Sequence, residues 1–540
     1  WEPTSWRTRG EETGAVPLPY VLRDELLERM KERVLIVDFG GQYVHLIARR
    51  CRELGVYSEI VDVKRLGEVD LREYSALILS GGPRSVSDED APTVDRSVIE
   101  SGITVLGICY GHQLIAKLMG GRVERSKVRE YGRTEVEVVA ESVLFSGLER
   151  RQVVWMSHGD VVLKPPPGFR VTAVSETGAI AAMEDPERRV YSVQFHPEVR
   201  HTENGRTILE NFLRRAAGLK ERWNPVDRVQ EIMEEIRRTV RPGEGVICGV
   251  SGGVDSVTTA LILHRVVGDD LHVVFVDHGL MRKGEVEEVL GVLRGLGIRN
   301  VHFVEARSRF LEALRGVADP EEKRKVVGRL FAEVFKEVAR SIPNVRYLAQ
   351  GTIYPDRVES GATGSVTSVI KSHHNVGGLP RDLGLDLIEP LKDLYKDEVR
   401  EVARALGVPE RIVRRHPFPG PGLSVRIVGE VTEEKLEVCR AASAIVEEEL
   451  ERAGLYDSVW QAFAVVGDDR WVGVKGDERE EGRVVIVRIV TSEDGMTADW
   501  FRAPHDLLDR ISRRITNEVP GVTMVCYAVS SKPPSTIEPC

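Results

Sequence analysis

The 540-residue sequence lacks the features that mark membrane, secreted and metal-cluster proteins. It has no run of about 18 apolar residues, as a membrane-spanning helix would need, and no apolar core of a secretory signal. Its cysteines form no Cys-x-x-Cys pair, which argues against a zinc site or disulfide framework and favours a reducing, cytoplasmic compartment. The net charge of −10 disfavours nucleic-acid binding. We therefore expect neither a membrane nor a nucleic acid as partner. The six cysteines are Cys51, Cys109, Cys248, Cys439, Cys526 and Cys540.

The sequence does contain a repeated alternation of apolar segments and helical stretches. Segments such as "RVLIVDFG" and "GITVLGIC" run into glycine and are separated by amphipathic stretches, and the alternation resumes at residue 246. This pattern indicates α/β domains with largely parallel sheets, and the length exceeds what one core holds. We predict two doubly wound, mostly parallel α/β domains followed by a small α+β domain. The predicted divisions are an extension (1–32), a first domain (33–218), a second (219–415) and a third (416–540).

The string "GICYGHQ" places Cys109 at a turn between an apolar strand and a helix. A strained turn of this kind exposes a nucleophile, and the start of a helix favours the thiolate. The string "QFHPEV" supplies His196 as a base, with Glu198 to orient its imidazole. The alternative is that the cysteine and the histidine are ordinary core residues.

These strings resemble the class I glutamine amidotransferase family, over about residues 33–215. The resemblance implies that the thiol attacks the side-chain amide of glutamine, that a glutamyl thioester forms and that ammonia leaves, with His196 as base and acid. It also implies a pocket whose oxyanion donors come from "SGGP" and whose wall includes "WMSHGD". The residues assigned to this pocket are Gly81, Gly82, Tyr110, Gln113 and His158.

The string "GVSGGVDSV" joins a second apolar strand to a helix through two glycines. Such a loop presents backbone N–H groups and a helix N-terminus to an anion. It lacks the lysine of a Walker A loop, so it suits pyrophosphate, with Asp255 available for Mg²⁺. The alternative is a plain tight turn. The string is similar to the phosphate loop of the ATP pyrophosphatases, which implies cleavage of ATP between its α and β phosphates. The predicted ATP residues are Ser251, Gly252, Gly253, Val254, Asp255, Ser256 and, at the end of the next strand, Asp277.

Six further strings follow downstream, and with both loops they resemble the glutamine-hydrolysing GMP synthase family over about residues 33–538. In order they are "AQGTIYPDRVES", "KSHHNVGGLP", "LKDLYKDEVR", "RHPFPGPGL", "DGMTADW" and "SSKPPSTIE". The resemblance implies that ATP adenylates XMP and that ammonia displaces AMP to leave GMP. It implies Mg²⁺ with ATP, no zinc, no organic cofactor, and a homodimer formed through the third domain. The residues implied to bind XMP or to close over it are Arg324, Lys371, His373, His374, Asp477, Lys532 and Glu538.

Three other interpretations fit part of the sequence. An NAD synthetase-like enzyme would share the adenylating loop, but its glutamine-hydrolysing part normally lacks "GICYGH" and "FHPE". A tRNA-thiolating protein would need a reactive thiol near the loop, whereas Cys248 is expected to pack inside its strand. A non-catalytic subunit would not need both loops intact. The chain departs from the family at its end, where Pro539 and Cys540 replace Trp-Glu, so a changed affinity for XMP is expected there first.

Overall fold

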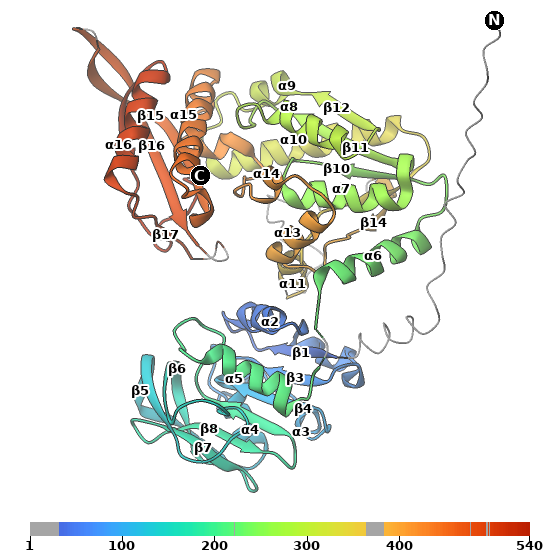
Figure 1. Ribbon diagram of the computed structural model, residues 1–540, viewed down its shortest axis with the longest axis vertical. Coiled ribbons are helices and arrows are strands. Elements are labelled where there is room, and N and C mark those ends of the chain that lie inside the picture. Colours follow the sequence, from blue (N-terminus) through green and yellow to red (C-terminus); the bar gives the residue numbers. More distant parts are fainter. Residues whose placement is uncertain are drawn as a thin grey trace, which may run out of the picture. The chain divides into compact units, whose positions relative to one another are not determined.

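The computed structural model describes residues 32–220, 222–362, 383–475, 477–492, 495 and 497–539. The chain divides into two compact units, Trp1–Asn224 and Pro225–Cys540, coloured blue to green and green to red in Figure 1. Each unit has its own sheets and is described by itself. Within the described part of the chain, no helix combines the length and apolar composition needed to span a bilayer.

The first unit is built on one nine-stranded sheet in the order β2-β1-β3-β4-β9-β8-β7-β5-β6. The first five strands in that order are parallel, and the remaining pairings are antiparallel. β9 pairs with β4 on one side and with β8 on the other, so it joins the two halves of the sheet. The strands are β1 (Arg33–Asp38), β2 (Tyr57–Asp62), β3 (Ala76–Leu79), β4 (Thr104–Ile108), β5 (Arg122–Val138), β6 (Arg151–Lys164), β7 (Arg170–Ser175), β8 (Ile180–Asp185) and β9 (Val190–Val193).

Continuous apolar sequence accounts for the parallel half of this sheet. Every residue of β3 and of β4 is buried, as expected where both faces of a parallel sheet are covered. Leu77 and Val105 pack in one cluster with Leu114 and Ile115, which face the sheet from α4. The helices are α2 (Val44–Glu53), α3 (Arg96–Ile99), α4 (Tyr110–Leu118) and α5 (Gly205–Asn211), with 3₁₀ turns η1 (Val63–Glu68) and η2 (Leu71–Glu73) and a π turn, η3 (Phe212–Ala216).

The second unit contains an all-parallel, five-stranded sheet in the order β12-β11-β10-β13-β14. The strands are β10 (Gly245–Gly249), β11 (Leu271–Asp277), β12 (Val301–Glu305), β13 (Val345–Ala349) and β14 (Asp386–Ile388). Helices α6, α7 and α13 pack against one another, and α10 packs against β11. The helices and turns are α6 (Pro225–Thr239), α7 (Val254–Val267), η4 (Gly268–Asp270), α8 (Glu285–Gly295), α9 (Arg307–Ala313), α10 (Pro320–Ser341), α11 (Tyr354–Ala362), α13 (Lys396–Ala405), α14 (Glu410–Val413) and η5 (Gly422–Arg426).

A smaller sheet follows in the same unit. Strands β15 (Gln461–Lys475) and β16 (Glu478–Thr491) form a long antiparallel hairpin, visible as the projecting orange-red arm of Figure 1. β17 (Asp499–Trp500) and β18 (Val522–Tyr527) pair with β16. The other elements are α15 (Glu433–Arg452), η6 (Tyr456–Ser458) and α16 (His505–Glu518).

One apolar core joins the two sheets of the second unit. A single cluster of buried side chains includes Val274 of β11, Leu423 of η5, Leu436 of α15 and Val485 of β16. The five-stranded sheet and the smaller sheet are therefore packed together. The predicted fold class, α/β with parallel-rich sheets and a small C-terminal part, is confirmed, whereas the predicted divisions at 218/219 and 415/416 stay predictions.

Candidate active sites

Cys109 occupies a strained turn between β4 and α4. Its φ is +53°, a region that side chains rarely adopt. The backbone can turn this tightly because glycines flank it: a β carbon on Gly111 would lie 2.2 Å from the Leu79 carbonyl oxygen. One on Gly107 would lie 2.6 Å from Ile115 Cδ1. The turn therefore presents the thiol at the carboxyl end of β4, as in a nucleophile elbow.

His196 and Glu198 lie beside this thiol. His196 Nδ1 is 2.7 Å from Glu198 Oε1, and the two side chains are 6% and 0% exposed. A β carbon on Gly81 would lie 3.0 Å from His196 Cε1 and 3.7 Å from Cys109 Cβ, so imidazole and thiol meet against this glycine. Cys109 Sγ also donates to the Ser157 carbonyl oxygen at 3.6 Å. The structure thus brings the three residues of the predicted catalytic set together.

The electrostatics of this group favour the imidazolium. Burial alone would lower the pKa of His196, because a charged ring loses its water. The carboxylate of Glu198 and the sulfur of Cys109, which hydrogen-bonds the ring, outweigh burial and hold the pKa of His196 well above its usual value. A cationic imidazole beside sulfur stabilises the thiolate, the form that attacks a carbonyl carbon.

Of the other predicted pocket residues, Tyr110 and Gln113 belong to α4 and Gly82 packs against it. Gly82 approaches Tyr110 so closely that a β carbon would lie 3.2 Å from Tyr110 Cγ. Tyr110 Oη donates to a backbone carbonyl at 2.5 Å. Gln113 Nε2 donates to the Asp160 carbonyl oxygen at 2.9 Å and to Gln194 Oε1 at 3.2 Å. The amide of Gln113 therefore braces α4 against the strand that carries "WMSHGD".

His158 belongs to a buried network that contains a residue missed from the sequence, Glu130. His158 Nδ1 lies 3.0 Å from the Asp160 carbonyl oxygen, and its Nε2 lies 3.0 Å from Glu130 Oε2. Ser175 and Thr177 donate to the same carboxylate. Burial would raise the pKa of Glu130, but these hydrogen bonds lower it to about 2. Glu130 faces His158 across the pairing of β5 with β6, so only the strand register could have revealed it.

The glycine loop connects β10 to α7 at the carboxyl edge of the parallel sheet. Ser251 N donates to Ser256 Oγ at 3.2 Å, and Ser256 Oγ donates to the Gly253 carbonyl oxygen at 3.0 Å. Gly252 has φ +83°, and a β carbon there would lie 2.5 Å from Val289 Cγ2 of α8. The loop is therefore folded onto the N-terminus of α7, a position that binds anions.

Asp255, in the first turn of α7, forms an ion pair with Lys396 through Oδ2. Its Oδ1 is buried and has no hydrogen-bond partner among the described residues, and the same holds for Oγ1 of Thr259 and of Thr352. A β carbon on Gly351 would lie 3.5 Å from Asp255 Cβ and 3.4 Å from Thr259 Oγ1, so these groups are neighbours. Buried polar atoms without partners indicate a place for a ligand. The sequence alone did not single out Lys396, which stands 141 positions after Asp255.

The donor set here fits a magnesium ion held mainly by nucleotide phosphates. The described part of the chain has no group of three His, Cys, Asp or Glu residues arranged for a metal. Mg²⁺ in nucleotide enzymes commonly takes one or two carboxylates together with phosphates and waters. Oδ1 of Asp255 is the oxygen that such an ion would use. Asp277 ends the neighbouring strand β11 at the same sheet edge, and its Oδ1 accepts from Gly279 N at 2.9 Å.

The structure gives the predicted XMP residues different surroundings. Glu538 receives hydrogen bonds from Arg426 at 3.1 and 3.2 Å and from Gln461 at 2.6 Å. Lys532 Nζ donates to the Gly495 carbonyl oxygen at 2.9 Å.

Arg324 lies half-buried on α10, while Asp477 is exposed in the turn between β15 and β16, with φ +66°. Lys371, His373 and His374 lie outside the described residues.

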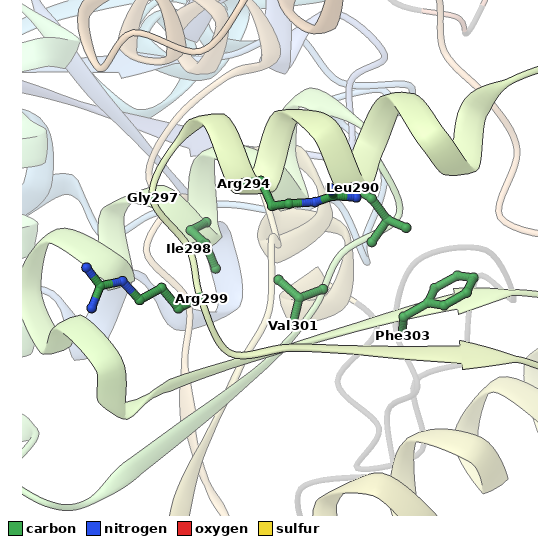
Figure 2. A pocket seen from close by; sticks show the side chains of 7 residues that line it. All are labelled: Leu290, Arg294, Gly297, Ile298, Arg299, Val301 and Phe303. Atoms are coloured by element: carbon green, nitrogen blue, oxygen red, sulfur yellow. The ribbon is translucent and has the colours of Figure 1, made fainter.

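A hollow of about 490 Å³ lies apart from these residues, between the end of α8 and strand β12. Figure 2 shows Leu290 and Arg294 reaching over it from α8, with Val301 and Phe303 rising from β12. None of the predicted site residues lines it.

Cys248, the thiol nearest the glycine loop, is not suited to catalysis. It is 1% exposed, and burial raises its pKa to about 12. A thiol of this kind is not ionised near neutral pH and packs inside its strand, as the sequence predicted. The geometry therefore disfavours a thiolation mechanism based on Cys248.

Three segments of the chain match known protein families, and full-length relatives match most of it. Residues 35–216 match the glutamine amidotransferase class-I family, residues 380–438 match NAD synthase, and residues 448–539 match the GMP synthase C terminal domain. A glutamine-hydrolyzing GMP synthase of Pyrobaculum aerophilum is 57% identical, over 94% of this chain and 100% of that relative. Relatives of the same description are 54% identical in Symbiobacterium thermophilum (95% of this chain, 100% of the relative) and 52% identical in Aquifex aeolicus (94% and 99%).

Proposed function

The chain belongs to the glutamine-hydrolysing GMP synthase family, and we propose that its two sites divide that reaction between them. It is a ligase that uses glutamine as amido donor. ATP adenylates the O2 oxygen of XMP and pyrophosphate leaves; ammonia then attacks C2, and AMP departs with that oxygen to give GMP. The 57% identity over 94% of the chain is the observation that carries the proposal.

The first half of the reaction, the release of ammonia from glutamine, takes place at the turn that carries Cys109. Cys109 Sγ attacks the side-chain carbonyl carbon of glutamine, and the oxyanion is stabilised by backbone N–H groups of the loop at Gly82 and of Tyr110. His196 gives its proton to the departing ammonia, and then takes a proton from the water that cleaves the thioester to glutamate. Glu198, at 2.7 Å from the ring, keeps His196 oriented and supports its positive charge.

The second half of the reaction, the adenylation and amination of XMP, takes place at the glycine loop. The N–H groups between Ser251 and Ser256 and the N-terminus of α7 bind the departing pyrophosphate. Lys396 holds Asp255 and adds a positive charge beside the phosphates. Asp255 would hold a magnesium ion, which would neutralise charge on ATP. Lys532 and Glu538 supply a cation and an acceptor for XMP.

We also propose a homodimer in the cytoplasm. The dimer is supported by exposed apolar side chains on both faces of β15: Trp471 is 55% exposed on one face, and Val472 and Val474 are 46% and 75% exposed on the other. Exposed apolar side chains gathered in this way mark protein interfaces.

An NAD synthetase-like enzyme is the second candidate, because residues 380–438 match that family. The class-I amidotransferase match over 35–216 and the C-terminal match over 448–539 favour GMP synthesis over it.

The test is the product inventory after mixing the full chain with Mg-ATP, glutamine and XMP. GMP, AMP, pyrophosphate and glutamate are expected in equal amounts. Glutamate without GMP would keep the amidotransferase half and refute GMP synthesis by this chain; exchange of Pro539 for the family's tryptophan would then show whether the altered C-terminus is the cause, because restored GMP formation would identify it. Amidation of deamido-NAD in place of XMP would favour the second candidate.

A further inference from the structure

We infer that Arg415 is a positioning residue for the ATP site, at one end of a strap, residues 415–426, that joins the glycine loop to Glu538. The inference rests on the proposed roles of these two sites. The strap lies wholly within the second unit and contains none of the residues assigned to either site from the sequence. It gives the adenylating half of the enzyme a direct physical connection between the ATP loop and the XMP side.

The first end of the strap grips the glycine loop. Arg415 Nη1 donates to the Gly252 carbonyl oxygen at 2.9 Å and to Glu285 Oε1 at 3.0 Å, and its Nη2 pairs with Glu288. The guanidinium is only 10% exposed. Gly252 has a positive φ and packs tightly against Val289, so the loop has little room to change its conformation. A hydrogen bond that holds the Gly252 carbonyl in one direction therefore also holds the conformation of the loop. Arg415 therefore holds the loop from behind, against α8.

The middle of the strap is immobilised by contacts on both sides. The ring of His416 stacks on Tyr456 at 3.8 Å with an interplanar angle of 7°. Arg282 donates to the His416 carbonyl oxygen at 2.9 Å and lies over the ring of Phe418 at 4.6 Å. Leu423 N donates to the Leu280 carbonyl oxygen at 2.8 Å. The strap is thus packed along the loop that follows β11.

The other end of the strap grips Glu538. Arg426, 1% exposed, sandwiches its guanidinium between the rings of Phe418 and Phe463, at 5.0 and 4.2 Å, and holds the Glu538 carboxylate. Gln461 closes the triangle, because its Nε2 donates both to Glu538 and to the Pro417 carbonyl oxygen of the strap. One continuous segment, half-buried over 417–420 and buried over 421–426, therefore positions a candidate ATP group and a candidate XMP group.

A rigid connection of this kind couples the two ligands. A rigid strap transmits displacement: when ATP draws the glycine loop into its bound position, Arg415 carries the strap with it and so sets the position of Arg426 and Glu538 for XMP; coupling between sites is reciprocal. We expect ATP to tighten XMP binding several-fold in the wild type, and Arg415 to be required for this effect.

The experiment compares Arg415→Gln, Arg415→Lys and the control Arg411→Gln. Arg411 pairs with the same Glu288, at 3.4 Å, but is 60% exposed and belongs to α14. Ammonia-supported GMP formation gives KM for ATP and for XMP, and equilibrium binding gives the Kd of XMP with and without a non-hydrolysable ATP analogue. Arg415→Gln is expected to raise KM for ATP about tenfold, to leave the Kd of XMP alone unchanged, and to abolish the tightening by the analogue.

Arg415→Lys is expected to fall between the wild type and Arg415→Gln, because one ammonium cannot reach the Gly252 carbonyl and both glutamates. Arg411→Gln is expected to match the wild type. An unchanged coupling factor in Arg415→Gln would overturn the inference, as would equal effects of Arg411→Gln. If Arg415→Gln fails to fold, Arg415→Lys decides, and full coupling there with a normal KM for ATP would refute the role. A wild type that makes no GMP from XMP would instead refute the proposed function.

Discussion

The two sites of this chain are prepared for their substrates in opposite ways. At the elbow, the thiol, the imidazole and the carboxylate are already in contact, and Glu198 is fully buried. At the glycine loop, Asp255 keeps one buried oxygen, Oδ1, without a partner among the described residues, while the cation Lys396 pairs with its other oxygen, Oδ2. Covalent catalysis needs its groups oriented before the substrate arrives. Adenylation needs charged groups whose partners, the phosphates and their metal ion, arrive with the nucleotide.

The largest effect is expected from removing the nucleophile. Cys109→Ala should abolish glutamine-supported GMP formation, by roughly 10⁴-fold or more, because no thioester can form. Ammonia-supported formation should stay intact, since ammonia then comes from solution. Cys526→Ala, which removes an exposed thiol, is the control. Loss of both activities in a folded Cys109→Ala protein would mean that the two sites are not separate.

Asp255→Asn tests the role of the carboxylate at the glycine loop. It should lower GMP formation by roughly 10³-fold with either nitrogen donor, because both routes need adenylated XMP. The measurement is pyrophosphate release in the presence of glutamine or ammonia. Asp269→Asn removes an exposed carboxylate of η4 near the same sheet and should change neither rate. Retained GMP synthesis in Asp255→Asn would remove this carboxylate from the mechanism.

Glu198→Gln tests how the buried carboxylate of the elbow acts on His196. The carboxylate helps to hold the pKa of His196 above its usual value, so its loss lowers that pKa. The imidazolium is then lost at a lower pH, and the alkaline limb of kcat/KM for glutamine hydrolysis should move towards acid, with a fall of about 10²-fold in rate. The control is Glu203→Gln, because the side chain of Glu203 is 57% exposed. An unmoved alkaline limb would contradict the role of Glu198.

The smallest effect concerns the geometry of the elbow. Gly111→Ala should destabilise the first unit by about 1–3 kcal/mol, because the new methyl group meets the Leu79 carbonyl oxygen at 2.2 Å. Thermal unfolding measures this, and glutaminase activity should fall with it. Gly67→Ala, where no atom lies within 4 Å of the added carbon, should be neutral by comparison. Equal unfolding temperatures for the two variants would show that the close approach is easily relieved.

Short sequence motifs were enough to predict the fold class, the family and both loops. Contacts between residues distant in the sequence determine the remaining features of the two sites. The fold class, the family and both loops follow from local sequence, because an elbow or glycine loop needs specific residues at adjacent positions. Glu130, Lys396 and Arg426 could not be found in this way. Each acts on a partner brought in by register or packing, as with Lys396 and Asp255, 141 positions apart. The surroundings of Gln113 likewise depend on where Gln194 lies in the folded sheet.

The position of β9 has a consequence for the enzyme while it is still being made. This strand fits between β4 and β8, and His196 and Glu198 follow it directly in the chain. A nascent chain on the ribosome therefore carries the thiol long before it carries the base, and the base arrives with the strand that closes the sheet. Polypeptides that end before His196 lack this base, so glutamine hydrolysis can begin only after β9 and the residues that follow it have been made.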